Sequence, residues 1–347
     1  MNNTKLIRGE RMDTEIWTKN QEDYLKFLYS KDCMILDYVS AFNTEFGTNR
    51  SKQSLINKAG RMGINSDFIE GSRYNHIKNM LDRESRIGQE KKNHDGTSMK
   101  IVDYIDANNV LIEFQDEFHY QVWVSYGNFK KGVVKNPYWK KLYGKGYLGV
   151  GPYTPYIKKG EKTKAHDAWT RMFDRCYNET YHKKYPTYIG CEVCKEWFNF
   201  QNFAKWFDDN YYEINTESME VDKDWLVVGN KIYSPDNCCI SPNIINTCLS
   251  THDKIKNFDM PIGVSWHKNG SYITRCSDHG KRKTIGYYHT IKEAEAAYWN
   301  YKINYVERLA EEYKTYIPSE LYNAMKNFKN TYQQRYGLKA QEDQNVC

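Results

Sequence analysis

Residues 261–316 carry the most constraining pattern of this chain, namely three strand-like runs followed by one capped helix. The first two runs flank a Lys-Asn-Gly turn at residues 268–270, a strong signal for a β-hairpin. A third run occupies residues 283–288. Thr290 and Glu293 then have the spacing of a capping box, which predicts the start of a long helix. The segment therefore predicts a three-stranded antiparallel sheet with one helix.

This segment, taken as a domain at residues 258–316, resembles the ethylene-response-factor DNA-binding domain of plants, which also occurs in phage proteins and homing nucleases. The matching residues are Gly263, Val264, Trp266, Tyr272, Gly280, Lys281, Ile285, Gly286, Tyr288, Thr290, Glu293, Ala294, Ala297 and Tyr298. The resemblance implies that the sheet enters the major groove of DNA while the helix braces it from behind. The side chains available for DNA contacts are Trp266, His267, Arg275, Lys281, Arg282, Lys283 and Tyr287. The alternative is a surface sheet with ordinary charges.

Residues 165–250 predict a second module that begins with two aromatic-rich helices. Residues 166–176 and 197–210 each place apolar side chains on one helical face. The rest of the module is predicted to contain, in order, a strand at residues 221–224, a turn at residues 229–230, a strand through Ile232 and a helix after Pro242.

The second half of this module resembles the HNH, or ββα-metal, nucleases. In that family a strand-end residue binds a metal ion, the next residue is a His that activates water, and a loop Asn orients this His. The resemblance gives Asp222 the metal-ligand position and Lys223 the base position. It gives Asn237 the loop position and Asn246 the metal-binding position on the helix. It also implies Mg²⁺ or another divalent cation as cofactor.

Lys223 departs from the family pattern. An ordinary lysine has a pKa near ~10.4 and stays protonated at pH 7, so it cannot accept a proton unless its pKa is strongly perturbed. Asp224 or a metal-bound hydroxide is then the expected base, and Lys223 is expected to contact the phosphate. A catalytically silent site is the alternative.

Nine cysteines is an odd number, and neither an apolar amino-terminal signal nor an 18-residue apolar run accompanies them. We therefore expect reduced cysteines in a cytoplasmic protein without a membrane partner. Cys191 and Cys194 form a Cys-x-x-Cys pair that, with Cys176 and Cys238, offers four thiolates to a structural zinc ion. Packing of free cysteines in a small core is the equal alternative.

Residues 14–65 predict three short helices in the manner of a helix-turn-helix. Thr18 and Gln21 have capping-box spacing, and Gly47 is expected to end the second helix. The last helix offers DNA the basic side chains of Lys52, Lys58 and Arg61. A structural or protein-binding helical bundle fits the same pattern.

Two further segments complete the chain between these modules. Residues 66–94 predict a helix that runs into a linker, and the period-two pattern of residues 95–136 predicts a small SH3-like β-module. Residues 130–164 hold ten lysines, among them Lys130, Lys131, Lys140 and Lys141, against one acid. Because lysine neutralises phosphate and aromatic faces stack on bases, residues 137–164 predict an extended basic tether along DNA. A solvated basic linker is the alternative.

The expectations combine into an α+β multidomain protein with a net charge of +6 and a helix and tail at residues 317–347. We expect a homing-type endonuclease that nicks double-stranded DNA, acting as a monomer on an asymmetric site in the cytoplasm of a phage-infected host. A catalytically silent transcriptional regulator is the main rival. A scaffold for host proteins is the third hypothesis.

Overall fold

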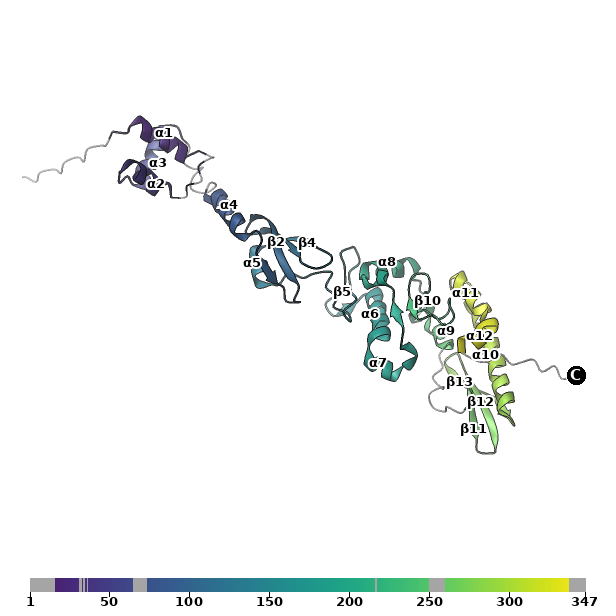
Figure 1. Ribbon diagram of the computed structural model, residues 1–347. Helices are drawn as coiled ribbons and strands as arrows, with labels where there is room; N and C mark the ends of the chain where they lie inside the picture. The colour runs from purple at the N-terminus through teal and green to yellow at the C-terminus, as the bar shows by residue number, and fades with distance from the viewer. Residues whose placement is uncertain are drawn as a thin grey trace, which may run out of the picture. The chain divides into compact units, whose positions relative to one another are not determined.

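The computed structural model describes residues 16–30, 33, 35, 37–64, 74–215, 217–249 and 260–336. These residues mix helices with several small sheets, in agreement with the predicted class at that coarse level (Figure 1). They belong to two compact units, Met1–Asn136 and Pro137–Cys347, which are described separately. None of the helices in the described ranges is long and apolar enough to cross a membrane.

Three short helices open the first unit: α1 (Lys19–Leu28), α2 (Tyr38–Phe46) and α3 (Lys52–Arg61). The predicted capping box between Thr18 and Gln21 is confirmed, and Ser51 caps α3. Gly47 ends α2 at a φ of 60°, a left-handed conformation that glycine adopts without strain. Apolar side chains of all three helices share one buried core.

The rest of the first unit consists of α4 (Tyr74–Arg86), β1 (Glu90–Lys92), β2 (Ser98–Asp106), β3 (Asn109–Phe114), β4 (Gln121–Val124) and α5 (Tyr126–Lys131). The predicted alternation is confirmed, because Val110, Ile112 and Phe114 are buried. The strands form one open antiparallel meander in the order β1-β2-β3-β4, not the SH3-like module that the sequence predicted.

Helix α4 belongs to this β-module and does not lead into a linker, so that part of the prediction for residues 66–94 is wrong. Arg83 Nη1 donates to the carbonyl oxygen of Tyr104, 2.6 Å away. The guanidinium of Arg86 lies 4.0 Å from the ring centre of Tyr126 and donates to the Tyr104 hydroxyl at 2.8 Å. These cation–π and hydrogen-bond contacts hold α4 against the sheet.

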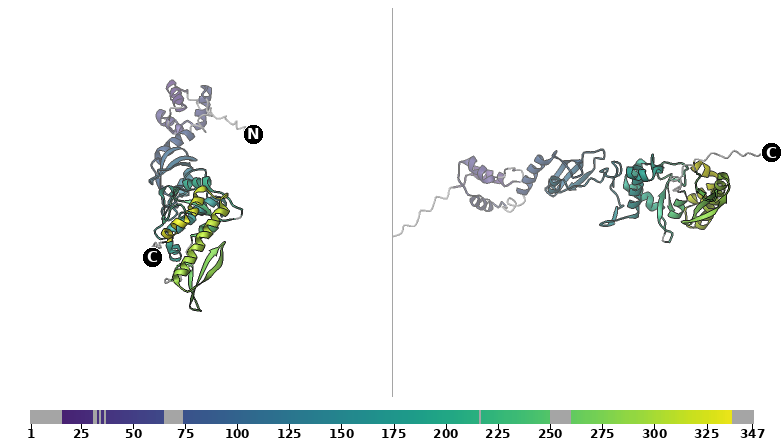
Figure 2. Two further views of the ribbon diagram at one scale, coloured as in Figure 1. Left: turned by 90° about the vertical axis from the view of Figure 1, so that its right-hand side faces the viewer. Right: turned by 90° about the horizontal axis from the view of Figure 1, so that it is seen from below.

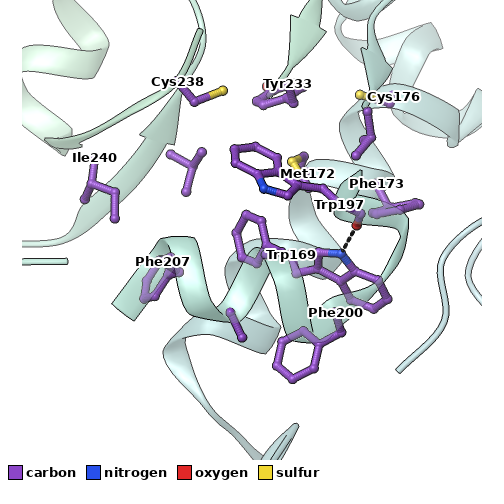
Figure 3. Close-up of a cluster of buried hydrophobic side chains, with 14 of the residues drawn as sticks. Trp169, Met172, Phe173, Cys176, Trp197, Phe200, Phe207, Tyr233, Cys238 and Ile240 are labelled. Atoms are coloured by element: carbon purple, nitrogen blue, oxygen red, sulfur yellow. Dashed lines mark hydrogen bonds between the residues drawn. The ribbon is translucent and has the colours of Figure 1, made fainter. Parts of the chain in front are cut away.

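The second unit begins with β5 (Tyr156–Lys158), β6 (Glu161–Lys162), α6 (Lys164–Tyr177), α7 (Glu179–Lys184), a 3-10 turn (Pro186–Tyr188), β7 (Glu192–Val193), a second 3-10 turn (Lys195–Phe198) and α8 (Phe200–Asn210). Helices α6 and α8 pack together through the aromatic faces that the sequence predicted. Figure 3 shows the centre of this core, where Trp169 Nε1 donates to the carbonyl of Trp197 at 2.7 Å.

The predicted basic tether at residues 137–164 is wrong, because part of this segment packs on the α6–α8 core. Tyr147 forms a parallel bridge with Asn199, and the Gln201 side chain accepts from the backbone of Tyr153 at 3.0 Å. A Cβ atom at Gly146 would meet the ring of Phe173 at 3.0 Å. The glycines that suggest flexibility in the sequence instead allow the backbone to approach the core closely.

The middle of the second unit contains β8 (Met219–Asp222), β9 (Ile232–Tyr233), β10 (Cys239–Pro242) and α9 (Asn243–Cys248). The predicted helix after Pro242 is confirmed. The sequence predicted two strands before this helix, and the structure has three. Strand β9 pairs in parallel with β7, and β8 pairs antiparallel with β10. This part of the chain therefore contains two separate two-stranded sheets, β8-β10 and β7-β9.

The last part consists of β11 (Val264–His267), β12 (Ser271–Asp278), β13 (Lys281–Tyr288), α10 (Ile291–Tyr313), α11 (Ser319–Lys326) and α12 (Phe328–Tyr336). The predicted sheet and the Thr290–Glu293 capping box are confirmed. Helix α10 runs along the three-stranded sheet in Figure 1 and in both views of Figure 2. The predicted terminal helix is in fact two helices, and residues 337–347 of the predicted tail lie outside the described residues.

Candidate functional site

The β8–β10 pair and helix α9 form a small ββα frame. Asp222, the last residue of β8, is paired with Cys239, the first residue of β10. Val221 and Ile240 anchor the two strands in the α6–α8 core. Pro242 precedes the first turn of α9, which packs against both strands. In this register the start of β8 lies opposite Pro242, and its end at Asp222 lies opposite the start of β10.

Asp222 occupies a tight turn at the end of β8. Its Oδ1 accepts from the backbone N–H of Asp224 at 2.7 Å and of Trp225 at 2.9 Å. The second oxygen, Oδ2, accepts no hydrogen bond from the described residues. Burial, with a smaller contribution from the Asp224 carboxylate, raises the pKa of Asp222 to about 6. Asp222 is therefore a buried carboxylate that is held by one oxygen only.

Lys223 is buried and paired with a carboxylate. Its Nζ lies 2.5 Å from Asp224 Oδ1 and 3.1 Å from the carbonyl oxygen of Asn230, and its side chain is 5% exposed. Burial is the largest single influence and lowers the pKa of this ammonium, but the Asp224 carboxylate together with smaller contributions from Cys191 and Asp222 outweighs it, so the pKa is raised. Lys223 therefore stays protonated in this arrangement and cannot act as a base.

Asn230 holds the loop that follows β8. Its Nδ2 donates to the carbonyl oxygens of Lys223 at 3.0 Å and Ile232 at 2.8 Å. Asn237, the predicted loop residue, places its Nδ2 3.5 Å from Asn230 Oδ1. Asn237 thus contacts the loop through Asn230. The sequence indicated Asn230 as part of the turn at residues 229–230.

Asn246, the predicted metal-binding residue of the helix, lies half-buried on α9. The carboxylate of Asp222 and the amide oxygen of Asn246 are the hard oxygen donors that Mg²⁺ takes, with waters and substrate oxygens filling its other positions. Asp222 and Asn246 therefore share the donor chemistry that Mg²⁺ prefers. No group of three or more His, Cys, Asp or Glu side chains suited to a metal occurs among the described residues.

The four predicted zinc ligands lie around the α6–α8 core. Cys176, Cys191 and Cys238 are buried, and Cys194 is half-buried. Figure 3 places Cys176 and Cys238 at the same edge of the aromatic cluster as Tyr233. Burial raises the pKa of all four thiols, in the case of Cys176 to about 12. Neutral, buried thiols fit the packing alternative, and metal analysis separates it from a zinc site.

The strand register divides the predicted DNA contacts of the three-stranded sheet between its two faces. Directly paired residues point to the same face, and neighbours along a strand alternate. Arg275 is paired with Thr284, and Ser277 with Arg282. On the same face His267 and Tyr287 pack edge to face, with ring centres 4.9 Å apart. The residues that share this face, here called the arginine face, are Ser265, His267, Ser271, Ile273, Arg275, Ser277, Arg282, Thr284 and Tyr287.

The opposite face of the sheet packs on α10. The Thr274 hydroxyl donates to the carbonyl of Ala294 at 3.0 Å. Lys283 Nζ lies 5.3 Å from the ring centre of Tyr301 on α10. Trp266, Lys281 and Lys283 lie on this second side by register, but all three are exposed, so their contact with DNA stays a prediction.

The predicted DNA contacts of the first unit and of the lysine-rich segment differ in their surroundings. Lys58 forms a 2.5 Å ion pair with Glu22 of α1, so its charge is partly neutralised within the bundle. Lys52 and Arg61 are exposed on α3. Lys130 lies 5.8 Å from the Tyr126 ring centre. The other lysines named in this set, all of them exposed, are Lys131, Lys140 and Lys141.

Arg335, which no sequence pattern singled out, reaches the site from α12. Its guanidinium donates to the carbonyl oxygens of Asp224 and Trp225, the latter at 2.8 Å. It also lies 5.4 Å from the ring centre of Trp225. Arg335 thus holds the same turn that carries the hydrogen bonds of Asp222.

A scan against protein-family models, a search of curated proteins and a search of solved structures each give no match to this chain.

Proposed function

We propose that this protein is a metal-dependent DNA endonuclease of the homing type, which nicks one strand at a sequence that its carboxy-terminal sheet reads. The observation that carries the proposal is the ββα frame, with Asp222 at the end of β8 and Asn246 on the adjoining α9. The HNH-type arrangement requires a strand-end metal ligand and a helix ligand in this order.

Asp222 and Asn246 would hold the magnesium ion of such a site. The ion, when bound, supplies Lewis-acid stabilisation of the phosphate and of the leaving 3′ oxygen. Asp222 offers Oδ2 for this role, because Oδ1 is engaged by two backbone N–H groups. Both ligands lie on packed elements, so few side-chain rotations have to be restricted when the site forms.

Asp224 is the proposed base. Its side chain is 44% exposed, and Lys223 holds one of its oxygens. Asp224 takes a proton from the attacking water, whose oxygen bonds to phosphorus as the bond to the 3′ oxygen breaks. The 3′ oxygen then takes a proton from solvent. Lys223 keeps the carboxylate oriented and adds positive charge near the phosphate.

The arginine face is the proposed sequence reader. Arg275 and Arg282 provide the planar donors that pair with guanine edges, and Tyr287 is 59% exposed beside them. Helices α2 and α3 of the first unit and the exposed lysines would contact the DNA backbone. Because the modules along one chain differ from one another, we expect a monomer on an asymmetric DNA site.

A silent DNA-binding regulator is the second candidate. The observation that favours it is the Lys223–Asp224 ion pair, because a paired lysine occupies the position of the usual catalytic His. The regulator shares all proposed DNA contacts and lacks only the cleavage step.

The two candidates are tested on one selected DNA sequence. The protein is first used to select its binding sequence from a random pool, and binding is then measured at 50 and 200 mM salt. Six to ten phosphate contacts predict a loss of affinity of about 10³- to 10⁵-fold across this range. Nicking of the selected sequence with Mg²⁺ but not with EDTA supports the nuclease. Salt-dependent binding without nicking supports the regulator, and absence of binding contradicts both.

A further inference from the structure

The amino-terminal half of α10 belongs to the three-stranded sheet. Ala294 is fully buried, and its carbonyl accepts the hydroxyl of Thr274 at 3.0 Å. Tyr298 packs over Gly263 so closely that any side chain at Gly263 would collide with the ring. These contacts fix the first turns of the helix to the sheet.

The carboxy-terminal half of the same helix belongs to the ββα frame. Buried side chains of residues 305–313 share one core with Trp225, Ile245 and Cys248. The hydroxyl of Tyr313 donates to the carboxylate of Glu217, just before β8. Helix α10 is continuous over its 23 residues, a length of about 34 Å at 1.5 Å per residue. One continuous helix, α10, therefore packs against both the three-stranded sheet and the ββα frame.

Helices α11 and α12 close the connection from the other side. Tyr332 and Tyr336 of α12 each pack on Trp299 of α10, with ring centres 4.9 Å apart. The same helix carries Arg335, which donates to the carbonyl oxygens of two consecutive residues, Asp224 and Trp225. Helix α12 thus contacts both the sheet-bound half of α10 and the turn of Asp222.

We infer that α10 and α12 make the reading sheet and the Asp222 site one rigid body, so that the cut phosphate lies at a single fixed spacing from the sequence that is read. The inference rests on the proposed function. Within it, Arg335 is a positioning residue, because it touches the Asp222 turn and not the DNA.

A flexible connection would give a different behaviour. The predicted boundary between the two domains, at residues 250–258, lies outside the described residues, and a tether there would let the site reach several phosphates. The buried core that α10 shares with the ββα frame contains residues from both sides of this boundary. Because protein interiors are close-packed, we expect this core to hold the two parts in one arrangement. We therefore expect the position of the nick to depend on its distance from the recognition sequence and little on the DNA sequence around the nick.

The spacing is measured on a set of DNA duplexes that share the selected recognition sequence. The flanking sequence is varied in one series, and in another one to five base pairs are inserted between the recognition sequence and the original cut. The protein is the full chain with Mg²⁺, and the nick is mapped to the nucleotide while hydroxyl-radical footprints are recorded on the same complexes. The expected nick stays at one distance from the recognition sequence in every duplex.

The outcomes separate the inference from the proposed function. Nicks that spread over several phosphates, or that follow the displaced original sequence, overturn the fixed spacing while leaving the nuclease intact. If the protein binds but does not nick, the footprint of the ββα frame still reports the spacing. A footprint at one constant distance then supports the rigid body even though the nuclease fails, and a variable one overturns it.

A pair of variants on α12 tests Arg335 itself. Arg335→Met removes the guanidinium but keeps an apolar stem, and Lys329→Met removes an exposed charge from the same helix. We expect both variants to bind DNA within about twofold of the parent. Arg335→Met should lower the nicking rate roughly 10-fold and spread the cut over neighbouring phosphates, since two partly buried carbonyl oxygens lose the donor that holds them.

Arg335→Lys, which keeps one charged donor, should recover part of the rate and of the single cut position. Thermal unfolding of each variant shows that the protein tested is folded. Equal nicking rates and equal cut positions in Arg335→Met and Lys329→Met overturn the positioning role.

Discussion

Replacing His166 tests whether the lysine-rich segment is packed or is a tether. His166 is 6% exposed and lies between Tyr156, Trp169 and Phe200, with ring centres 5.2 to 5.9 Å away. Its Nδ1 is buried without a hydrogen-bond partner among the described residues. Burial, aided by the nearby charge of Lys162, lowers the pKa of His166 from about 6.5 to about 4.

The sign of the pH effect follows from this lowered pKa. Protonation favours the unfolded chain, so the stability contributed by neutral His166 is complete above pH 6.5 and is lost as the pH falls toward 4. Between pH 7 and pH 5 the loss amounts to about 2 kcal/mol in the free energy of unfolding. In a unit of this size that change shifts the melting temperature by roughly 4–8 °C.

The assay compares the parent protein with His166→Phe, which keeps an aromatic ring and removes the titrating group. The free energy of unfolding of both proteins is measured with urea at pH 7 and pH 5. Titrating groups other than His166 affect both proteins equally, so they cancel in the difference between parent and variant. We expect the stability of the parent relative to the variant to fall by about 2 kcal/mol on going to pH 5. The packed arrangement is refuted if the difference in unfolding free energy between parent and variant does not change with pH, or if NMR gives His166 a pKa near 6.5.

Three further predictions concern the site and the reader. Lys223→Ala should lower nicking by about 10²- to 10³-fold without loss of DNA binding, and a Lys223→His variant that nicks faster than the parent would contradict the assignment of Asp224 as the base. Arg275→Ala should cost about 1–3 kcal/mol at one base position in a binding-selection assay, whereas Lys283→Ala, on the helix-facing side, should leave base preference unchanged. Metal analysis of protein purified without chelator should give one zinc per chain if Cys191 and Cys194 are ligands; zinc-free folded protein supports the packing alternative.

Local patterns in the sequence predicted the elements well. Capping boxes at Thr18 and Thr290 and the left-handed Gly47 depend on residues within one helical turn, so they can be identified without tertiary structure. The predicted aromatic faces of α6 and α8 likewise follow from helical spacing alone.

Pairing between distant segments could not be predicted in the same way. Strand β9 has only two residues, too few for a periodic signal, and its pairing with β7 depends on the packed core. Arg335 and Asp224 are 111 residues apart, and nothing in either local sequence indicates their contact. The close approach of the backbone at Gly146 to the ring of Phe173 could not be predicted either, because a glycine in the sequence fits a flexible segment and a closely packed one equally well.

The most direct test of the account is nicking of the selected DNA sequence by two aspartate variants. Asp222→Ala removes the buried carboxylate at the end of β8, and Asp208→Ala removes an exposed carboxylate from α8. We predict that Asp208→Ala nicks like the parent, and that Asp222→Ala binds the sequence but does not nick it at any Mg²⁺ concentration. Nicking by Asp222→Ala at the parent rate would contradict the assignment of the ββα frame as the catalytic site.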